Sequence, residues 1–463
     1  MKHSRYTGLL GLLLLLASCG EDRTGEFYAL IEDRMWMEEV MRENYLWYND
    51  IPAIENENDY FAERSVFFKS LLSKEAMDGK GDPYSYMEET PAAEAPEAAR
   101  GLTLTRTSTY GIEFELVSDP LQTTTHTFAR VLYVLPQSPA EQAGLKRGDW
   151  ISAIDARRIT SDNYTALQQG GTVRLATARI VAAEGGYAWQ ATDTLTVAPS
   201  VSMEINPFMV DSVYQADGRR IAYLMYNEFA TGSNNDGTES VYNEQMKQIF
   251  GRFKAQSPDA FILDLRYNPG GYLHCAQALG SLLAPAAALG QDFITLEYND
   301  KAGQAGVSYP FDTALADANL DLKKIYILTG SYTASASEAV INGLKPWMGS
   351  DNVVLLGEKT VGKNVAMQAF ENTAYGFTLW PVVARVFNAA HESDYGEGIA
   401  PQYTLTERQV LGSWYEPGDT REYLLKNALS LITAGTLADE PTAESRTACR
   451  PIPLRKAEGI RIR

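Results

Sequence analysis

The chain has 463 residues, more than one ordinary hydrophobic core accommodates, and this length predicts roughly two to four domains. Hydrophobic residues make up 45% of it and charged residues 21%, so most of it should fold into globular domains. The formal net charge of −19, without a concentrated Lys/Arg patch, argues against a nucleic-acid partner. The 3 Cys and 4 His are scattered and no phosphate-cradling glycine loop is present, so we expect no metal and no cofactor.

The first residues are typical of a secretory signal. Lys2 and Arg5 precede an apolar run that is shorter than the roughly 20 residues needed to span a bilayer. The run ends in Leu16–Cys19, with the sequence LASC, which resembles a bacterial lipobox. The resemblance implies that residues 1–18 are a lipoprotein signal peptide and that Cys19 is lipidated. An ordinary secretory signal with an incidental Cys is the alternative.

Lipidation would place the protein in the cell envelope. Residues 19–26 are expected to form a short tether, and Gly20 after the Cys favours the outer membrane by analogy with other lipoproteins. We therefore expect a lipid-anchored protein that contacts the membrane through its anchor and faces the periplasm or the cell surface. No later segment has the length and apolar character of a membrane-spanning helix.

Residues 27–100 are expected to form a small helical N-terminal domain and a linker, with the helical pattern running to about Glu89. Apolar residues recur there at the spacing of one helix face, at Met37, Val40, Met41, Tyr45 and Tyr48. A second apolar stretch, Tyr60–Leu72, has similar spacing, and Pro91–Arg100 is rich in Ala, Glu and Pro. This spacing predicts a packed core rather than a ligand site.

Residues 103–200 are expected to form a small β-rich domain. Apolar and polar residues alternate with the period of a strand in three segments, Ile112–Leu116, Phe128–Val134 and Thr194–Val197. The intervening Ser138–Ile151 segment predicts a short helix capped by Ser138, a turn at Gly144 and a strand from Trp150.

The same Ser138–Ile151 segment closely resembles the SPAxxAGLxxGDxI signature of bacterial PDZ domains. The resemblance implies a groove in which an extended peptide adds a strand to the sheet and backbone amides hold its C-terminal carboxylate. The candidate peptide-binding loop consists of Tyr110, Gly111, Ile112 and Phe114. A plain strand start is the alternative interpretation of this loop.

Segments with strand and helix character alternate from residue 203 to 435, which predicts an α/β layered core. The expected strands are Ile221–Tyr226, Ala260–Leu265, Ile325–Leu328 and Val353–Leu356, and the expected helices are Ser240–Phe253, Leu273–Leu283 and Ser335–Leu344. Residues 436–463 lack periodicity and are expected to be a loose C-terminal tail.

Three segments of this region can carry chemistry. Asp264–Gly271 runs from a strand into a double-glycine turn, whose backbone N–H groups could stabilise an oxyanion. Thr333–Glu338 opens a helix, where a Ser lies among unpaired N–H groups at the positive end of the helix dipole. Gly357–Lys363 presents a Lys that could act as a base if burial lowered its pKa. Taken singly, each segment is also compatible with an ordinary turn, a helix cap or a solvated Lys.

In this order, and after a PDZ-like segment, the three segments resemble the C-terminal processing proteases, also called tail-specific proteases. The resemblance covers roughly residues 103–435 and implies a multidomain α/β protein with a crotonase/ClpP-like α/β serine protease core. It implies that Ser335 is the nucleophile and Lys363 the general base and later the general acid. The oxyanion hole would be formed by backbone N–H groups of Ala336 and of Gly270 or Gly271.

Two further residues are carried over from the family with departures. Glu338 matches a carboxylate that supports the Lys in some members, and we expect it to orient rather than pair, because a carboxylate beside an amine raises the amine's pKa. In the family, a Gln that supports the Lys stands at the position that Met367 has here. In this chain the Gln stands one residue later, at Gln368. Asn364 stands where a Gly usually follows the Lys, and Pro346–Asn352 slightly lengthens the Ser-to-Lys spacing.

The sequence thus predicts a serine endopeptidase that cleaves protein or peptide substrates near their C-termini through a covalent acyl-enzyme. The PDZ domain would capture the substrate tail. A Ser-His-Asp triad that uses His274 is an alternative, but it leaves Lys363 unexplained. A catalytically decayed PDZ lipoprotein that binds peptides or partners is the alternative from another functional class.

Overall fold

The computed structural model describes residues 24–89, 106–233, 237–303, 306–412, 414–439, 449–452 and 460–462. The predicted signal peptide, Cys19 and the linker Pro91–Arg100 lie outside the described residues. The chain divides into two compact units, residues up to 43 with 47–82, and residues 44–46 with 83 onwards. Among the described helices, none has both the length and the apolar composition that a bilayer crossing requires.

The smaller unit is helical. Its elements are α2 (Thr24–Asn44), the 3-10 helices Tyr48–Asp50 and Glu57–Phe61, α3 (Arg64–Ser70) and α4 (Ala76–Gly79). The predicted inner face of α2 is buried at Met37, Val40 and Met41. Asp33 on the same helix accepts hydrogen bonds from Arg34 and Arg64. Burial acts to raise the pKa of Asp33, but these two arginines outweigh it and hold the pKa below its usual value.

The expected helical pattern to Glu89 is wrong at its end. Residues Tyr86–Glu89 form strand β1, which pairs antiparallel with β19 (Phe377–Trp380). The conformation of such a short segment depends on its partner strand, which lies almost 300 residues away in the sequence. The segment's own periodicity therefore does not predict its structure.

The PDZ-like region contains one antiparallel sheet of order β22-β3-β4-β5-β7-β8, with β6 paired to β5. Apart from β22, the strands of this sheet are, in chain order, β3 (Ile112–Ser118), β4 (Thr127–Val134), β5 (Trp150–Ile154), β6 (Arg157–Arg158), β7 (Val173–Ala183) and β8 (Gly186–Val197). Helix α6 (Pro139–Gln142) begins where predicted, because the Ser138 hydroxyl accepts a hydrogen bond from the Glu141 N–H at 3.2 Å. Beside this sheet, β2 (Arg106–Thr109) pairs with β9 (Val201–Glu204).

The following region has a six-stranded sheet of order β10-β11-β12-β15-β16-β21. Its strands are β10 (Phe208–Ala216), β11 (Arg219–Tyr226), β12 (Ala260–Asp264), β15 (Ile325–Thr329), β16 (Val353–Gly357) and β21 (Tyr403–Thr404). All neighbours are parallel except β10, which is antiparallel to β11 at the edge. The carboxyl ends of the parallel strands therefore share one edge, where sites form in α/β proteins.

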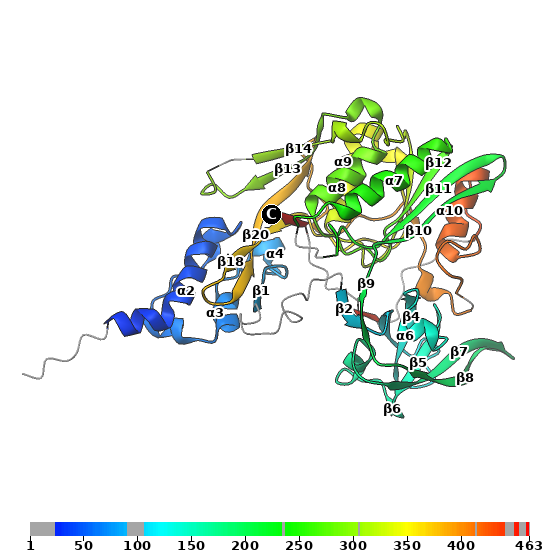
Figure 1. Ribbon diagram of the computed structural model, residues 1–463, viewed down its shortest axis with the longest axis horizontal. Coiled ribbons are helices and arrows are strands. Elements are labelled where there is room, and N and C mark those ends of the chain that lie inside the picture. Colours follow the sequence, from blue (N-terminus) through cyan, green and yellow to red (C-terminus); the bar gives the residue numbers. More distant parts are fainter. Residues whose placement is uncertain are drawn as a thin grey trace, which may run out of the picture. The chain divides into compact units, whose positions relative to one another are not determined.

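Helices cover both faces of this sheet, which confirms the α/β layered fold class (Figure 1). The helices are α7 (Val241–Ala255), α8 (Leu273–Leu283), α9 (Ala336–Met348) and α10 (Tyr423–Ala434). Leu224 and Leu263 pack in one buried cluster with α7, α8 and α9, whereas Tyr223 and Ile262 pack with α10 on the opposite face. Successive strand residues face opposite sides, so each of these mainly apolar strands serves two cores.

A second sheet of order β14-β13-β20-β17-β23 extends from the core. Its strands are β13 (Asp292–Tyr298), β14 (Gly306–Pro310), β17 (Val365–Gln368), β20 (Val382–Asn388) and β23 (Ile460–Ile462), and the short β18 (Phe370–Asn372) pairs with β19 nearby. The expectation of a loose tail over 436–463 is wrong for its described strands, β22 (Cys449–Ile452) and β23. Both are added to strands distant in sequence, which leaves no local period to detect.

A buried ion cluster joins the PDZ-like region to the α/β core. Arg147 donates to Glu407 at 2.8 Å and to the Tyr267 hydroxyl at 2.6 Å, and Arg266 donates to Glu407 at 3.0 Å and to Glu422 at 2.6 Å. Burial acts to raise the pKa of Glu407, but the two arginines outweigh it and hold the pKa well below its usual range. Each charge in the cluster is paired, as desolvated ions require.

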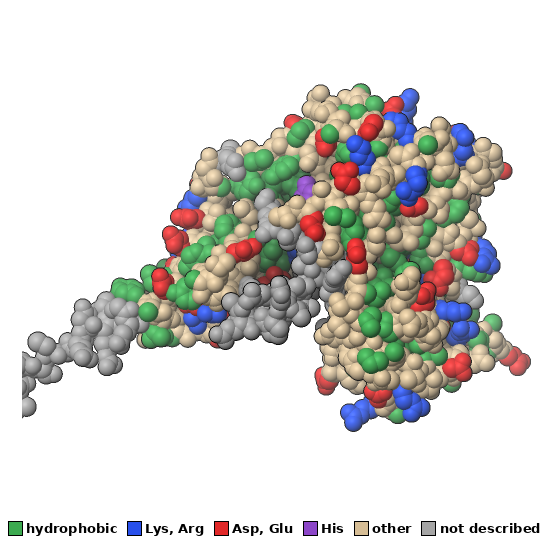
Figure 2. All heavy atoms as spheres, viewed as in Figure 1, with side chains coloured by type: hydrophobic (Ala, Val, Ile, Leu, Met, Phe, Trp, Pro, Cys, Tyr) green, Lys and Arg blue, Asp and Glu red, His purple; other side chains and the backbone are tan. Residues whose placement is uncertain are grey.

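Charges on the molecular surface are mixed. On the face drawn in Figure 2, Lys and Arg side chains lie dispersed among Asp and Glu rather than gathered in one basic patch.

Candidate functional site

Ser335 lies at the leading end of helix α9, immediately before its first residue, Ala336. Its backbone has φ +61° and ψ −109°, a region that L-residues rarely occupy and that costs about 1–3 kcal/mol. Its side chain is fully buried, and its Oγ has no hydrogen-bond partner among the described residues. A strained, unpartnered hydroxyl at a helix N-terminus is an unusual way to cap a helix, and it is what a nucleophile requires.

Lys363 lies between strands β16 and β17, directly after the loop Glu358–Gly362. It has 5% of its surface exposed. Its Nζ lies 3.5 Å from the Met367 sulfur and 4.4 Å from the centre of the Tyr84 ring. The Tyr84 hydroxyl also donates to the Gly362 carbonyl at 3.4 Å. Because Ser335 Oγ has no hydrogen-bond partner, the amine does not close a hydrogen bond to it in this arrangement. An aromatic face stabilises the charged form of an amine.

The Glu338 carboxylate connects the Ser-bearing and Lys-bearing segments. Its Oε2 accepts hydrogen bonds from the N–H groups of Ser335 at 2.7 Å and Lys363 at 2.8 Å. Its Oε1 accepts from the Gly362 N–H at 2.7 Å and the Thr360 hydroxyl at 2.5 Å. Burial raises the pKa of Glu338, although these donors oppose the rise. The carboxylate thus binds three backbone N–H groups and one hydroxyl.

The double-glycine turn lies against Ser335. A Cβ on Gly270 would lie 2.9 Å from the Ser335 Cβ, and one on Gly271 would lie 2.3 Å from the Phe229 carbonyl oxygen. Both residues also have positive φ, at +107° and +137°, which favours glycine. The turn and Ala336 thus lie beside Ser335.

Asn268 in the same turn is a residue whose part was missed from the sequence. Its Oδ1 accepts the Gly270 N–H at 2.9 Å, and its carbonyl accepts the Ala334 N–H at 3.1 Å. Its Nδ2 donates to the Tyr226 carbonyl at 2.8 Å. Asn268 therefore fixes the turn on both sides, and the Gly270 N–H is engaged rather than directed at a substrate. The signal in the sequence that could have indicated this part was the position of Asn268, between Tyr267 and the Pro-Gly-Gly sequence.

The remaining residues predicted near the Lys lie as follows. Met367, not Gln368, contacts the amine, and successive residues of strand β17 point to opposite faces. The Asn364 amide donates to the Ser393 carbonyl at 2.6 Å. His274, at the start of α8, packs its ring 5.7 Å from that of Tyr272, and burial lowers its pKa. Since Ser335 Oγ has no partner, His274 does not complete a triad with it.

The predicted PDZ loop places its side chains inside the domain. Tyr110, Ile112 and Phe114 are buried in the core of this region, so they shape the groove from beneath. Gly111 has φ +82°, and a Cβ there would lie 2.2 Å from the Ser138 Cβ, which makes glycine necessary. Within the loop, the Gly111 N–H donates to the Thr109 hydroxyl at 3.0 Å.

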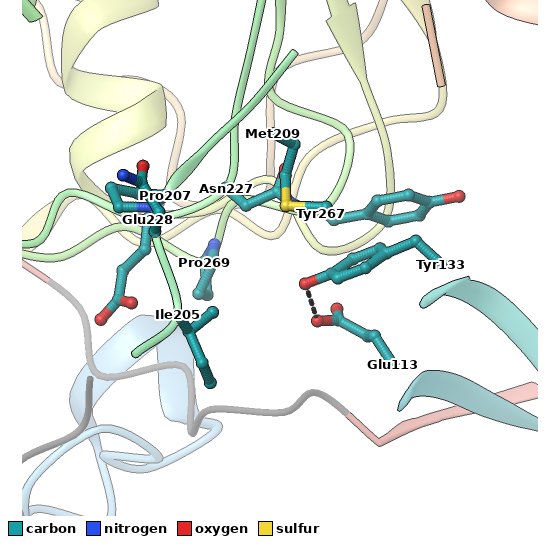
Figure 3. A pocket seen from close by; sticks show the side chains of 10 residues that line it. Glu113, Tyr133, Ile205, Pro207, Met209, Asn227, Glu228, Tyr267 and Pro269 are labelled. Carbon is teal, nitrogen blue, oxygen red and sulfur yellow. Dashed lines mark hydrogen bonds between the residues drawn. The ribbon is translucent and has the colours of Figure 1, made fainter. Parts of the chain in front are cut away.

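A small pocket lies between the PDZ-like sheet and the double-glycine turn (Figure 3). Glu113 and Tyr133 line it from strands β3 and β4 and are hydrogen-bonded to each other. Tyr267 and Pro269, which precedes Gly270, line it from the core. The pocket thus adjoins strand β3 on one side and the double-glycine turn on the other.

The described residues include no cluster of three or more His, Cys, Asp or Glu side chains with the geometry of a metal site. The groups gathered around Ser335 are its hydroxyl, the Glu338 carboxylate and backbone N–H groups, with the Lys363 amine in the adjoining loop. Such groups can carry out nucleophilic attack on a carbonyl and stabilise the oxyanion that forms.

Comparisons with known proteins agree with this site. Three family models match the chain: the peptidase S41 N-terminal domain over residues 34–86, a PDZ domain over 130–176, and peptidase family S41 over 220–405. The crystal structure of an S41-family protein from Bacteroides fragilis is similar at a TM-score of 0.74 and 34% identity. It covers 87% of this chain and 97% of that one.

Curated relatives point the same way. The chain is 26% identical to the carboxyl-terminal-processing protease of a Picosynechococcus species, over 82% of this chain and 84% of the relative. It is 25% identical to the carboxy-terminal processing protease CtpA of Bacillus subtilis, over 69% of this chain and 60% of the relative. The layered α/β core with its PDZ domain is thus of the serine protease class. The chain belongs to peptidase family S41.

We predict that Glu338→Gln lowers kcat at least tenfold with little change in KM, because the amide cannot accept from all four donors of Glu338. In the wild type, kcat should fall as acid protonates Glu338, beginning above the ordinary Glu pKa of about 4.3, because burial raises the pKa of Glu338. The contribution of Glu338 to this acid limb should be absent from the variant. The pH dependence of kcat measures both effects.

Glu358→Gln is the matched control, since Glu358 is also largely buried but accepts from Arg408 at 3.1 Å. It should keep kcat and its acid limb. A Glu338→Gln enzyme with wild-type kcat and the same acid limb would contradict the positioning role.

Proposed function

We propose that the protein is a serine endopeptidase in which Ser335 attacks the scissile carbonyl and Lys363 serves as its base. The observation that carries this proposal is the Glu338 carboxylate, which binds the Ser335 and Lys363 N–H groups with one oxygen. Two segments that lie almost thirty residues apart are thereby held together at the leading end of α9. The bond to the Ser335 N–H is one half of an ordinary capping box, but a helix cap does not need the further bonds to Gly362 and Lys363.

The proposed reaction begins when Lys363 turns from Met367 and the Tyr84 ring towards the Ser335 hydroxyl. As the Oγ bonds to the substrate carbonyl carbon, its proton passes to the neutral Lys363 amine. Lys363 then protonates the departing amine of the substrate, which leaves an acyl-enzyme ester on Ser335. Water hydrolyses the ester with Lys363 again as base, and the oxyanion is stabilised by the Ala336 N–H and the glycine turn.

The PDZ domain would present the substrate. Strand β3 follows the Gly111 loop, so a peptide tail added to β3 would have its end at that loop. The pocket of Figure 3 lies between β3 and Pro269 and offers a path from the tail to the catalytic turn. We propose that cleavage occurs near substrate C-termini for this reason.

Ser335→Ala and Lys363→Ala should each abolish cleavage of an unfolded protein substrate, with a loss of at least about a thousandfold in kcat. Both should retain wild-type binding of the substrate, because neither residue is part of the PDZ loop. Mass spectrometry of the products, together with binding measured by fluorescence anisotropy, checks this. If the wild type, Ser335→Ala and Lys363→Ala all bind the substrate tightly and none of them cleaves it, the result would instead support a peptide-binding protein without protease activity.

A second prediction concerns tail capture. Amidating the C-terminus of a peptide substrate removes the carboxylate that a PDZ loop binds, so KM should rise about tenfold with kcat unchanged. Steady-state kinetics of the acid and amide forms of one peptide measure this. Equal KM values would mean that the free carboxylate is not what the protein recognises.

We also propose that the protein is a lipoprotein anchored in the outer membrane through Cys19. The support is the LASC sequence that ends the apolar run. Cys19→Ser should prevent incorporation of radiolabelled fatty acid and move the protein from the membrane to the soluble fraction. Membrane association unchanged in Cys19→Ser would refute the anchor, and Cys275→Ser serves as the control because Cys275 is buried.

A further inference from the structure

Two short strands near the end of the chain lie where bound peptides would lie. Strand β22 pairs antiparallel with β3, with Cys449 opposite Val117 and Ile452 opposite Phe114. It is added to the free edge of β3, the strand that follows the Gly111 loop, and runs towards that loop. Strand addition at this edge is how a PDZ domain holds a peptide. The chain's own residues thus occupy the peptide position of its PDZ sheet.

The second strand, β23, lies at the catalytic site. It pairs parallel with β17, the strand that begins two residues after Lys363. On its other side the Arg461 N–H donates to the Gly271 carbonyl at 3.1 Å, and Arg461 bridges to Tyr272. The β23 backbone therefore lies between the Lys-bearing wall of the site and the double-glycine turn, and it makes backbone hydrogen bonds of the kind that extended substrates make.

The Arg461 side chain is buried among three aromatic residues, Tyr86, Tyr272 and Trp380, which we call the aromatic pocket. Its guanidinium carbon is 4.9 Å from the Trp380 ring centre and 5.6 Å from the Tyr272 ring centre. Its Nη2 donates to the Tyr86 hydroxyl at 3.4 Å, and Tyr86 stacks on Trp380. Arg461 has 4% of its surface exposed, so a charged side chain is the anchor of this strand.

Aromatic faces suit a guanidinium particularly well. The planar, weakly hydrated guanidinium stacks on rings and keeps its charge when desolvated, whereas an ammonium is more strongly hydrated. The Glu88 carboxylate, which accepts from the Trp380 indole N–H at 3.2 Å, adds a negative charge beside the pocket. The pocket thus has the shape and charge to select Arg among peptide side chains.

We propose that the aromatic pocket is a specificity site for an Arg side chain of peptide substrates, and that Arg461 fills it as an intramolecular competitor. This proposal rests on the endopeptidase function proposed above. The same terminal segment pairs with the edge of β3 and with β17, the two positions where a peptide would bind. A strand that merely completed one sheet would pair at only one of them. Substrates would gain access by displacing β23.

The direct test uses the full chain with Ser335→Ala, so that nothing is cleaved, and a fluorescent peptide with the sequence of residues 454–463. Because a tethered competitor acts at an effective concentration of about millimolar, adding Arg461→Ala to the protein should tighten peptide binding at least about tenfold. Arg385→Ala, which removes an exposed Arg from strand β20, is the matched control and should leave the affinity unchanged. Fluorescence anisotropy measures each dissociation constant.

Two further measurements exclude an effect of folding alone. The same peptide with Ala at the position of Arg461 should bind the Arg461→Ala protein at least about tenfold more weakly than the original peptide does. Trp380→Leu in the protein should weaken binding of the original peptide but not of the Ala peptide. Equal affinities of the two peptides, or no effect of Arg461→Ala in the protein, would overturn the proposal.

The proposed protease function is judged separately, with Ser335 intact. If the binding results hold but no chain cleaves an Arg-containing peptide, the aromatic pocket stands as a binding site and the protease function fails. If peptides are cleaved but Arg461→Ala changes neither KM nor binding, the protease function stands and the pocket proposal fails. The supporting result is a KM for the Arg peptide that falls several-fold in Arg461→Ala.

Discussion

The arrangement of the site depends on one buried carboxylate. Glu338 is fully buried, and its two oxygens accept from four donors that belong to the helix start and to the loop before Lys363. A buried carboxylate without these donors would be costly, and the donors without the carboxylate would be unsatisfied. The two catalytic segments therefore hold each other in place through a shared acceptor. Ser335 in its strained conformation is tolerated because this network determines the surrounding backbone.

Some groups of the site have the positions that the proposed reaction needs, and others do not. The backbone of the Ser and Lys segments is in place, but Lys363 contacts Met367 and Tyr84, and the Gly270 N–H is bound to Asn268. At the same time strand β23 lies along the cleft. These features describe one resting arrangement, in which the terminal segment takes the place of a substrate while the amine and the oxyanion turn are held in other contacts. Substrate entry would then be linked to completion of the site.

Much of the fold followed from local patterns. Strand β5 and helix α8 have the predicted bounds, because turn and cap residues mark their ends. Ser335, Lys363 and the glycine turn are predicted together through the resemblance to the C-terminal processing proteases. The structure adds the physical reason, because the three segments follow parallel strands that end at one edge of the sheet. The contacts of Tyr84 and of strands β22 and β23 could not, since they join segments far apart in sequence. Gln368 differs from Met367 only by strand face, which the sequence alone left open.

The most direct measurement is amide hydrogen exchange of Ser335, Gly362 and Lys363 as a function of pH. If one carboxylate holds all three N–H groups, they should lose protection together as the pH is lowered, with a common midpoint above the ordinary Glu pKa of about 4.3. In Glu338→Ala all three should exchange rapidly throughout. Separate midpoints for the three amides, or protection that survives in Glu338→Ala, would contradict the account.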